Sequence, residues 1–536
     1  MLDRLRRAVL AAAMVMSWLA LVAGPQARAA DGGVAWQSAA NDGDIALAFA
    51  RARSEGKPVL LYWGAKWCPP CNQLKATLFN RHDFIERSRS LVAVDIDGDL
   101  PGAQKLGSRF KVSGYPTMVL MRSDGTELMR LPGEADAPQV LQLLELGLAG
   151  GRAAKDVLAD ARAGKALPGA EWRMLAFYSW ISDESQLLTA AERPGVLAGL
   201  SAACPRSEAD SATRLMLKAL AESDDGKGVK ADAALRQRVR GWLNDPAVVR
   251  AQMDVLTNYA AEITKAVSAP GSAERKAIVT PFDAALQRLQ ADTTLSRADR
   301  LTALGARVDL ARIDAAKDER HPRIAAPLLQ QVRDASAQGD REITDGYERQ
   351  AVITAAAYIL GQAGLWSESD VLLKANLAKS HSPYYLMSQL AGNARKLGRK
   401  NEALRWYEEA FARSEGPATR LQWGAQYVTA LVELAPADDA RLERAVSRMI
   451  DDAALDKGAF DGRSARSLSR VGKQLSQWNR DGKHNAVLDR LRAKLQPMCA
   501  RFDGDASARA ACDGTFQQPG KERLSAGVGL RATPTA

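Results

Sequence analysis

The feature that most constrains the fold of this chain is a pair of cysteines two residues apart, placed where a strand pattern gives way to a helical pattern. The motif is Trp-Cys-Pro-Pro-Cys at residues 67–71. It follows a continuous apolar run at residues 59–63, which is typical of a strand buried on both faces. Proline suits the first turn of a helix, because its missing N–H would have no partner there. The pattern predicts a buried strand, a short loop and a helix that begins at the cysteines.

This placement indicates redox chemistry. At the start of a helix, unpaired amide N–H groups and the positive end of the dipole stabilise a thiolate, so the pKa of Cys68 should lie below that of a free thiol. Cys71 follows one turn later and can attack a mixed disulfide on Cys68, which releases the partner. We therefore predict Cys68 as the catalytic nucleophile and Cys71 as the resolving thiol.

Other uses of a Cys-x-x-Cys motif fit less well. Zinc would need two more ligands, and His82 is the only histidine nearby. Covalent haem attachment needs histidine after the second cysteine, where the chain has Asn72. The acidic residues 95, 97 and 99 predict a turn at a strand end rather than a calcium loop, because Leu100 occupies the position of the loop glycine. We predict no metal and no cofactor, and a purely structural disulfide remains the alternative.

A second motif, Gly114-Tyr115-Pro116, precedes another apolar run. A proline in this position indicates a turn that can hold a cis peptide bond. Since proline has no N–H, it leaves the strand end open, and the backbone of a substrate can pair there. Trp67, Tyr115 and Pro116 are the predicted substrate-binding residues.

Strand and helix patterns alternate around these motifs. Further strands are expected at residues 91–96, 117–121 and 127–131, and helices at about 44–56, 102–110 and 140–148. The last two strands form a hairpin through Asp124-Gly125, with the second strand alternating between buried and exposed residues. Residues 31–42 are expected to be a polar leader. The alternation predicts one α/β domain over residues 43–150.

Residues 43–150 resemble the thioredoxin superfamily. The resemblance is carried by the segment KPVLLYWGAKWCPPC at residues 57–71 and by GYPT at residues 114–117, in the order and at the distance typical of that family. It is similar above all to the exported group that includes the soluble domain of the transmembrane disulfide reductase. The resemblance implies a central mixed sheet flanked by helices, Cys68 and Cys71 as the redox pair, and Pro116 as the family's cis-proline.

One position departs from the family pattern. Thioredoxins usually carry a buried aspartate six residues before the first cysteine, where it assists proton transfer to and from the resolving thiol, but this chain has Tyr62. A phenol with a pKa near 10 is a poor base at neutral pH, so proton exchange would need water or Lys66. Tryparedoxin-like and nucleoredoxin-like proteins share the Trp-Cys-Pro-Pro-Cys motif and look like reductases. This resemblance favours reduction or isomerisation over oxidation.

After residue 150 the strand patterns stop, and helical patterns separated by glycine and proline breakers predict an all-α region. Three residue pairs recur 34 positions apart: Gly364 and Gly398, Glu368 and Glu402, Pro383 and Pro417. That period belongs to tetratricopeptide repeats. We therefore expect a helical region over 151–340 and tetratricopeptide-like repeats over 341–500, with a generic helical bundle as the alternative.

The N-terminus predicts export. Basic residues, an apolar stretch at residues 8–24 and a small-x-small site near Ala29 indicate a secretory signal peptide over residues 1–29, with an uncleaved membrane anchor as the alternative. The mature protein should be periplasmic or secreted, with no membrane span. Outside the cytosol structural thiols tend to be oxidised, so we predict a structural disulfide between Cys499 and Cys512 and a buried, unreactive Cys204. Residues 501–536 are expected to be a partly disordered tail.

These patterns favour an exported thiol-disulfide oxidoreductase, a reductase or isomerase. Its expected partners are protein substrates or a redox donor protein, bound through a transient mixed disulfide, and a peptide or protein ligand of the helical region. The net charge of +10 is spread thinly without a basic stripe, which argues against a nucleic-acid partner. The alternative is an interaction scaffold in which the α/β domain is a docking module with little turnover.

Overall fold

A five-stranded mixed sheet lies at the centre of the N-terminal part of the protein. The computed structural model describes residues 33–516, except for residues 181, 184, 224–227 and 317. The strands are β1 (Gln37–Ser38), β2 (Val59–Gly64), β3 (Val92–Asp97), β4 (Thr117–Met121) and β5 (Glu127–Leu131). Their order is β1-β3-β2-β4-β5, with β1 and β2 parallel to β3, and with β4 antiparallel to β2 and β5. The expected central mixed sheet is confirmed.

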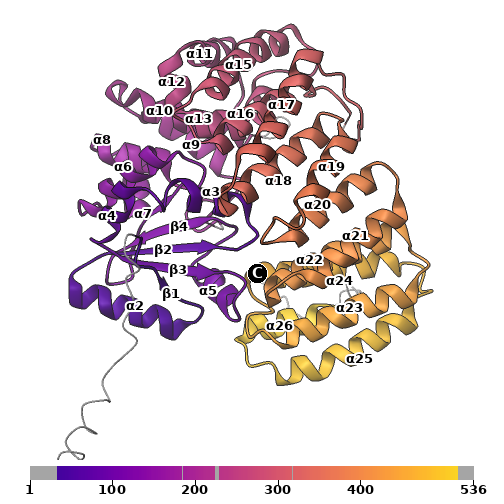
Figure 1. The fold of residues 1–536 in the computed structure, drawn as a ribbon. Coiled ribbons are helices and arrows are strands. Elements are labelled where there is room, and N and C mark those ends of the chain that lie inside the picture. The colour runs from indigo at the N-terminus through magenta and orange to yellow at the C-terminus, as the bar shows by residue number, and fades with distance from the viewer. Residues whose placement is uncertain (1–32, 181, 184, 224–227, 317, 517–536) are drawn as a thin grey trace, which may run out of the picture.

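Helices cover both faces of this sheet (Figure 1). They are α2 (Asp42–Glu55), α3 (Pro69–Thr77), α4 (His82–Ser88), α5 (Ala103–Arg109) and α6 (Ala137–Leu148). Alternation along β2 assigns the faces, because successive side chains of a strand point to opposite sides. Leu61 and Trp63 pack in a cluster with side chains of α2 and α5. Leu60 and Tyr62 pack in a second cluster with side chains of α3 and α6.

Two short elements were not expected from the sequence. Strand β1 lies within residues 31–42, which were expected to be a polar leader, and it pairs with β3 through two residues. Helix α4 begins at His82 without a side-chain cap, and its buried residues are Phe84 and Ser88. Neither segment is long enough to show an apolar period, so their structure depends on the sheet and helices beside them.

Strand β5 is more buried than its expected alternation implies, since residues 128–131 are all buried. Arg130 explains the difference. Its guanidinium donates hydrogen bonds to Glu127 and to the carbonyl oxygens of Phe110, Lys111 and Ser182. A polar side chain on the expected solvent face is therefore covered by the segment after α5 and by Ser182, which follows residue 150.

The rest of the described chain is helical, as expected. Its helices are α7 (Ala154–Arg162), α8 (Gly169–Phe177), α9 (Arg193–Ala203), the 3-10 helix η1 (Arg206–Glu208), α10 (Ala209–Ala221), α11 (Ala233–Asn244), α12 (Pro246–Ala251), α13 (Met253–Asn258), α14 (Ala260–Val267), α15 (Ala273–Ala291), α16 (Arg297–Ala311), α17 (Ala326–Glu342), α18 (Gly346–Gln362), α19 (Trp366–Asn376), α20 (Pro383–Lys396), α21 (Lys400–Arg413), α22 (Pro417–Leu434), α23 (Asp439–Ala454), α24 (Gly462–Trp478), α25 (Asn485–Arg501) and α26 (Ala506–Gly514).

Helices α18 to α23 form three successive pairs. Gly364 and Gly398, which are 34 residues apart, occupy equivalent turns, between α18 and α19 and between α20 and α21. Both have positive φ, 81° and 74°, which glycine adopts without steric cost. This explains why glycine recurs at that spacing. That the pairs are tetratricopeptide repeats stays a prediction.

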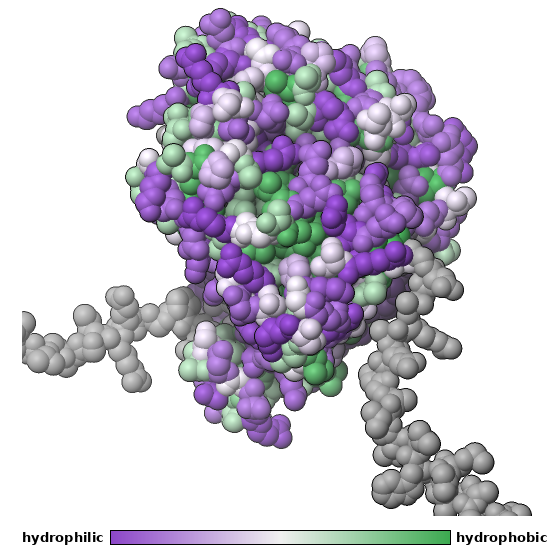
Figure 2. All heavy atoms as spheres, turned by 90° about the vertical axis from the view of Figure 1, so that its left-hand side faces the viewer, coloured by the Kyte–Doolittle hydropathy of each residue, from purple (hydrophilic) through white to green (hydrophobic). Residues whose placement is uncertain are grey.

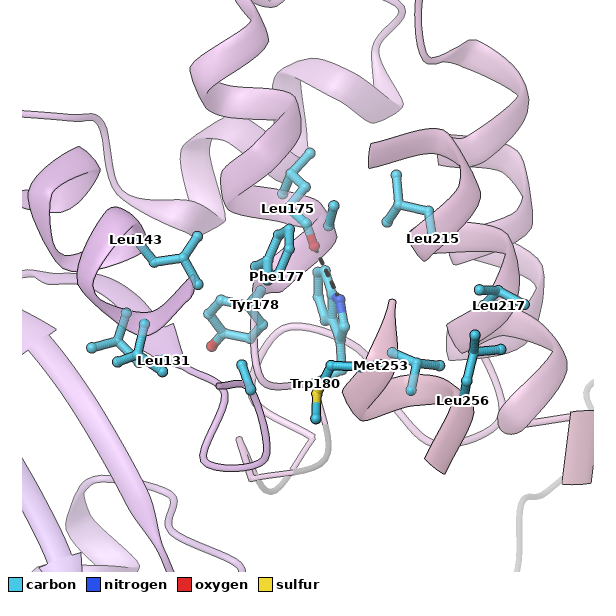
Figure 3. Close-up of a cluster of buried hydrophobic side chains, with 14 of the residues drawn as sticks. Leu131, Leu143, Leu175, Phe177, Tyr178, Trp180, Leu215, Leu217, Met253 and Leu256 are labelled. Atoms are coloured by element: carbon cyan, nitrogen blue, oxygen red, sulfur yellow. Dashed lines mark hydrogen bonds between the residues drawn. The ribbon is translucent and has the colours of Figure 1, made fainter. Parts of the chain in front are cut away.

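A continuous apolar core joins the sheet to the first helices of the helical region. In Figure 3, Leu131 of β5 and Leu143 of α6 lie beside Tyr178, and Trp180 lies between them and helices α10 and α13. The indole N–H of Trp180 donates to the carbonyl oxygen of Leu175 at 3.2 Å, so this buried polar group is satisfied. Figure 2 shows that hydrophilic residues cover most of one face of the molecule, with apolar residues gathered near its middle.

The expected signal peptide, residues 1–29, lies outside the described residues. Within the part of the chain that the structure describes, no helix combines the length and apolar character that crossing a bilayer would require. Of the expected tail, residues 506–514 form α26, and Cys512 in this helix forms a disulfide with Cys499 of α25. The remainder of the tail from residue 517 is likewise outside the described residues.

Arg130 of β5 joins the α/β part to the helical region through its hydrogen bond to Ser182, and its substitution tests how much this buried side chain stabilises the fold. Replacing Arg130 by Ala should lower the free energy of unfolding by about 3 kcal/mol, because Glu127 and three carbonyl groups lose a buried donor. Thermal and urea unfolding of the full chain measure the change. Arg122→Ala is the control, since this exposed side chain donates to the carbonyl oxygen of Gly151 alone and should cost less than about 0.5 kcal/mol. Equal effects of the two substitutions would contradict this role.

The disulfide between α25 and α26 should stabilise the C-terminal helices. It closes a loop of 13 residues in sequence separation, for which the chain-entropy estimate is about 3 kcal/mol. The double variant Cys499→Ser/Cys512→Ser should therefore unfold at lower urea concentration. A variant is preferable to a reductant, because a reductant would also open the Cys68–Cys71 bond. An unchanged unfolding midpoint would show that the bond does not stabilise the fold.

Candidate redox site

Cys68 and Cys71 lie at the start of α3, directly after the buried strand β2. Cys68 is the N-cap residue, and the backbone N–H of Cys71 points to the Cys68 sulfur at 3.2 Å. The two residues form a disulfide, with their Cα atoms 5.2 Å apart. Once this bond is reduced, the helix N-terminus supplies the N–H groups that stabilise a thiolate on Cys68. The local geometry is therefore suited to thiol–disulfide exchange.

The second motif lies against the first. The peptide bond between Tyr115 and Pro116 is cis, immediately before β4. The side chains of Trp67 and Tyr115 pack against a small buried cluster formed by the two cysteines and Ala65. The hydroxyl of Tyr115 accepts a hydrogen bond from the amide of Gln104 at 2.8 Å. The structure thus brings together the predicted residues of the two motifs, although they are more than 40 positions apart.

Tyr62 occupies the position of the family's buried aspartate, and its surroundings make it a poor base. Its hydroxyl is buried and has no hydrogen-bond partner among the residues that the structure describes. Desolvation by burial, with the charges of Asp95 and Asp97, raises the pKa of Tyr62 well above its usual value. Lys66, the other group considered for proton exchange, is exposed and forms an ion pair with Glu415, with its Nζ 3.0 Å from the carboxylate. Burial thus makes the phenol of Tyr62 a poor base, and the Lys66 ammonium points to Glu415.

Two carboxyl groups lie near this position instead. On β3, Val94 and Ile96 face α2 and α5, so Asp95 and Asp97 face the α3 side, as Tyr62 does. Desolvation raises the pKa of Asp95, and desolvation together with the charge of Asp99 raises the pKa of Asp97 to about 6. Both aspartates line a cleft of about 480 Å³ that also includes Lys66 of the redox loop. A carboxyl group with a raised pKa therefore lies on the sheet face that carries Tyr62.

The helical region covers the exposed side of this site. The indole N–H of Trp67 donates to Asp99 and to the hydroxyl of Thr419, each at 2.9 Å. The Trp67 ring lies 5.1 Å from that of Trp423 in an edge-to-face arrangement. The guanidinium of Arg463 lies 5.2 Å from the ring centres of both Trp67 and Tyr115. Residues of α22 and α24 are therefore part of the redox site.

Additional contacts surround this cover. Gln73 of α3 donates to Asp299 of α16 at 2.6 Å. The backbone N–H of Gly102, just before α5, donates to Asp456 at 3.0 Å. His381 Nε2 lies 3.0 Å from the carbonyl oxygen of Lys66, which places this histidine beside the redox loop. These partners are hundreds of residues from the motif, so no local pattern could reveal them.

The remaining cysteines lie elsewhere. Cys204 is half-buried, and its sulfur lies 3.6 Å from the carbonyl oxygen of Glu208. Desolvation and the charge of Glu208 raise the pKa of this thiol to about 11, so it is protonated at neutral pH. Cys499 and Cys512 are paired with each other. Cys68 and Cys71 are therefore the cysteines placed for exchange.

The chain is similar to known proteins with a thioredoxin-like domain, and the similarity includes the segment that carries the redox site. Residues 45–147 match the family model of a thioredoxin-like domain. The chain is similar to thiol:disulfide interchange protein DsbD of Pseudomonas fluorescens, with 32% identity over 123 residues, 22% of this chain and 21% of that protein. It is also similar to DsbD 1 of Pseudomonas aeruginosa, with 30% identity over 113 residues, 20% of this chain and 19% of that protein. The match spans about a fifth of these relatives' length. Residues 45–147 are thus a thioredoxin superfamily domain.

The raised pKa of Asp97 predicts a pH-dependent stability difference. Because the folded state raises this pKa from 3.8 to about 6, the charged carboxylate destabilises the fold at neutral pH, and protonation removes that cost. Asp97→Asn should match the wild type near pH 4 and exceed its stability above pH 6, by about 1–2 kcal/mol after solvent screening. Thermal unfolding across pH 4–8 measures the difference.

Asp124→Asn is the matched control. Asp124 is exposed in the β4–β5 turn, and hydrogen bonds from Thr126 lower its pKa, so its substitution should have the opposite sign at neutral pH. If the Asp97→Asn difference were constant from pH 4 to pH 8, the titration assigned to Asp97 would be wrong.

Proposed function

We propose that this thioredoxin-like protein is an exported, periplasmic thiol-disulfide oxidoreductase that reduces or isomerises disulfides of protein partners through Cys68 and Cys71. The observation that carries the proposal is the Cys68–Cys71 pair at the N-terminus of α3, packed beside the cis Tyr115–Pro116 bond. Similarity to part of proteins named as thiol:disulfide interchange proteins supports the reaction type. The predicted signal peptide supports the location.

The exchange proceeds in two displacements. In the reduced protein, the Cys68 thiolate attacks one sulfur of a partner disulfide, the partner S–S bond breaks, and the departing partner thiolate takes up a proton. Cys71 then loses its proton and attacks the Cys68 sulfur, which breaks the mixed disulfide and releases the second partner thiolate. The partner gains two electrons and two protons, and Cys68–Cys71 becomes a disulfide. A protein dithiol donor reverses these steps to restore the reduced pair.

The surrounding residues have roles in this scheme. Because Pro116 lacks an N–H, the start of β4 leaves room for the partner backbone to pair beside Tyr115. Trp67 supplies an apolar surface next to the nucleophile. Asp97, with a pKa of about 6, is the carboxyl group on this face that exchanges protons near neutral pH. It takes up the function for which the phenol of Tyr62 is unsuited.

An interaction scaffold is the second candidate, and one observation favours it. Cys68 is 2% exposed and Cys71 is fully buried beneath the helical region. A docking module whose disulfide never turns over would tolerate such burial. The two candidates differ in whether Cys68 ever forms a covalent bond to another protein.

Trapping decides between them. In the full chain, Cys71→Ser should accumulate a mixed disulfide between Cys68 and a disulfide-containing protein or peptide, because the resolving thiol is missing. Cys68→Ser should form no adduct and should lower insulin-reduction turnover by at least about 100-fold. Non-reducing electrophoresis and mass spectrometry identify the linkage.

Cys204→Ser is the matched control, since its thiol is protonated and outside the site, and turnover should be unchanged. Incubation should continue until a small alkylating reagent would have modified all of Cys68. If no Cys68 adduct forms within that time, the oxidoreductase proposal is wrong and the scaffold is favoured.

A further inference from the structure

The surface that the reaction requires is occupied by the protein's own helices. Trp67 and Tyr115, the side chains proposed to receive a partner, lie beneath Arg463. The arrangement in Figure 1 shows how this arises: the helical region arches from α6 and α10 to α24, and both α3 and α5 lie on its inner side. Helix α18 packs along α3, and α24 packs against α5. A folded partner protein has no path to Cys68 in this arrangement.

We propose that helices α20, α22 and α24 form a movable cap over the redox pair, held closed by Asp99, and that opening this latch admits a protein disulfide to Cys68. The inference rests on the proposed function, because it assigns a regulated state to the same site. Exchange requires the sulfur of a partner to approach Cys68 directly, and a sulfur on a residue that is 2% exposed cannot be approached by a protein.

The hydrogen bonds that hold the cap closed meet at the carboxylate of Asp99. One oxygen of Asp99 accepts the indole N–H of Trp67 at 2.9 Å. The other accepts the hydroxyl of Thr419 and an N–H of Arg463. Asp99 is 8% exposed, so these bonds are shielded from water. A single side chain after β3 thus ties the redox loop to two helices of the cap.

The backbone at the start of α22 also depends on Asp99. Gly416, the N-cap residue of α22, has φ 78°, and a Cβ atom built there would lie 2.7 Å from the Cβ of Asp99 and 2.8 Å from its carbonyl oxygen. The absence of a side chain therefore lets the cap approach the redox loop this closely. A displacement of α22 away from Asp99 would break this close approach.

The two attachments of the helical region differ in character, which identifies the side that opens. Near α6, β5 and α8–α10 the contact is the continuous apolar core of Figure 3. Between the redox face and the cap the contacts include the ion pairs Asp99–Arg463 and Lys66–Glu415, together with the rings of Tyr385 and Trp423 on Trp67. Replacing such hydrogen bonds by bonds to water has a modest net free-energy cost. Exposing an apolar core to water has a cost that grows with the apolar area exposed. The cap can therefore leave the redox face while the apolar attachment holds.

Trp67 is the residue that a partner would compete for. The apolar cluster formed by α20–α26 includes Trp67 from the α/β part, where its ring lies beside Tyr385 and Trp423. In the closed cap, Tyr385 and Trp423 thus occupy the apolar surface of Trp67 that the proposed function assigns to a substrate. A partner that binds Trp67 and the backbone beside Tyr115, just before β4, would displace it.

The experiment measures access to Cys68 directly. The full chain carrying Cys204→Ser is reduced with a phosphine, and alkylation of Cys68 is followed by mass spectrometry with two reagents, iodoacetamide and a maleimide attached to a 5-kDa polyethylene glycol chain. Asp99→Asn should raise the rate with the large reagent about 10-fold and change the rate with iodoacetamide much less. Thr419→Val removes the bond that this hydroxyl donates to Asp99 and the bond that it accepts from Trp67, while Arg463 still pairs with the carboxylate. It should act in the same direction.

Glu415→Gln is the matched control at the same boundary. Its ion pair with Lys66 is solvent-exposed, so its loss should leave both labelling rates within about twofold of the wild type. Circular dichroism and the unfolding midpoint verify that each variant is folded. If neither Asp99→Asn nor Thr419→Val, folded as the wild type is, changes the ratio of large-reagent to small-reagent rates, the latch is wrong.

Insulin reduction by the same variants separates this inference from the function on which it rests. Faster labelling with faster insulin reduction supports both proposals. Faster labelling while no variant exchanges with any disulfide overturns the oxidoreductase and leaves the cap intact. Exchange at equal rates in the wild type and in both latch variants overturns the cap and leaves the oxidoreductase intact.

Discussion

The N-terminus of α3 is the constraint on which the rest of the site depends. Strand β2 is buried along its whole length, so it delivers Cys68 to the sheet edge with its position already determined. Pro69 then starts the helix, and the N–H of Cys71 is directed at the Cys68 sulfur. The same edge carries Tyr115 and Asp99, from the segments before β4 and after β3. Everything that recognises or covers the redox pair is organised around this end of the sheet.

Local patterns in the sequence were sufficient for most of the sheet and for the redox motif. The apolar run before Cys68, the cysteine spacing and the proline before β4 act over a few residues, and each produced the expected element. Patterns over such short distances could not reveal Thr419 or Arg463, which contact Asp99 across more than 300 positions. The sequence did mark Asp99 as unusual, because it ends a run of three aspartates in and after an otherwise apolar strand. The partners of Asp99, however, are brought to it by tertiary packing.

The protein joins its two parts in two physically different ways. Apolar side chains of β5 and α6 merge with those of α8–α10, as in the interior of a single domain. Opposite this, charged and polar groups meet around the side chain of Trp67 and form hydrogen bonds with one another. This second boundary resembles a contact between transient partners more than a core. The burial of the redox pair thus depends on interactions of the kind that water and other proteins can replace.

Arg130 also determines how far the redox module extends along the chain. Its guanidinium lies under β5 and takes one of its acceptors from Ser182, beyond the end of the thioredoxin-like segment. A fragment cut after residue 150 would keep this arginine but lose that carbonyl group and the aromatic residues that shield it. In such a fragment Arg130 would still bond to Glu127 and to the carbonyl groups of Phe110 and Lys111, but it would lack one acceptor and its cover. The contacts of Arg130 therefore extend beyond residues 45–147, the segment that matches the thioredoxin-like family model.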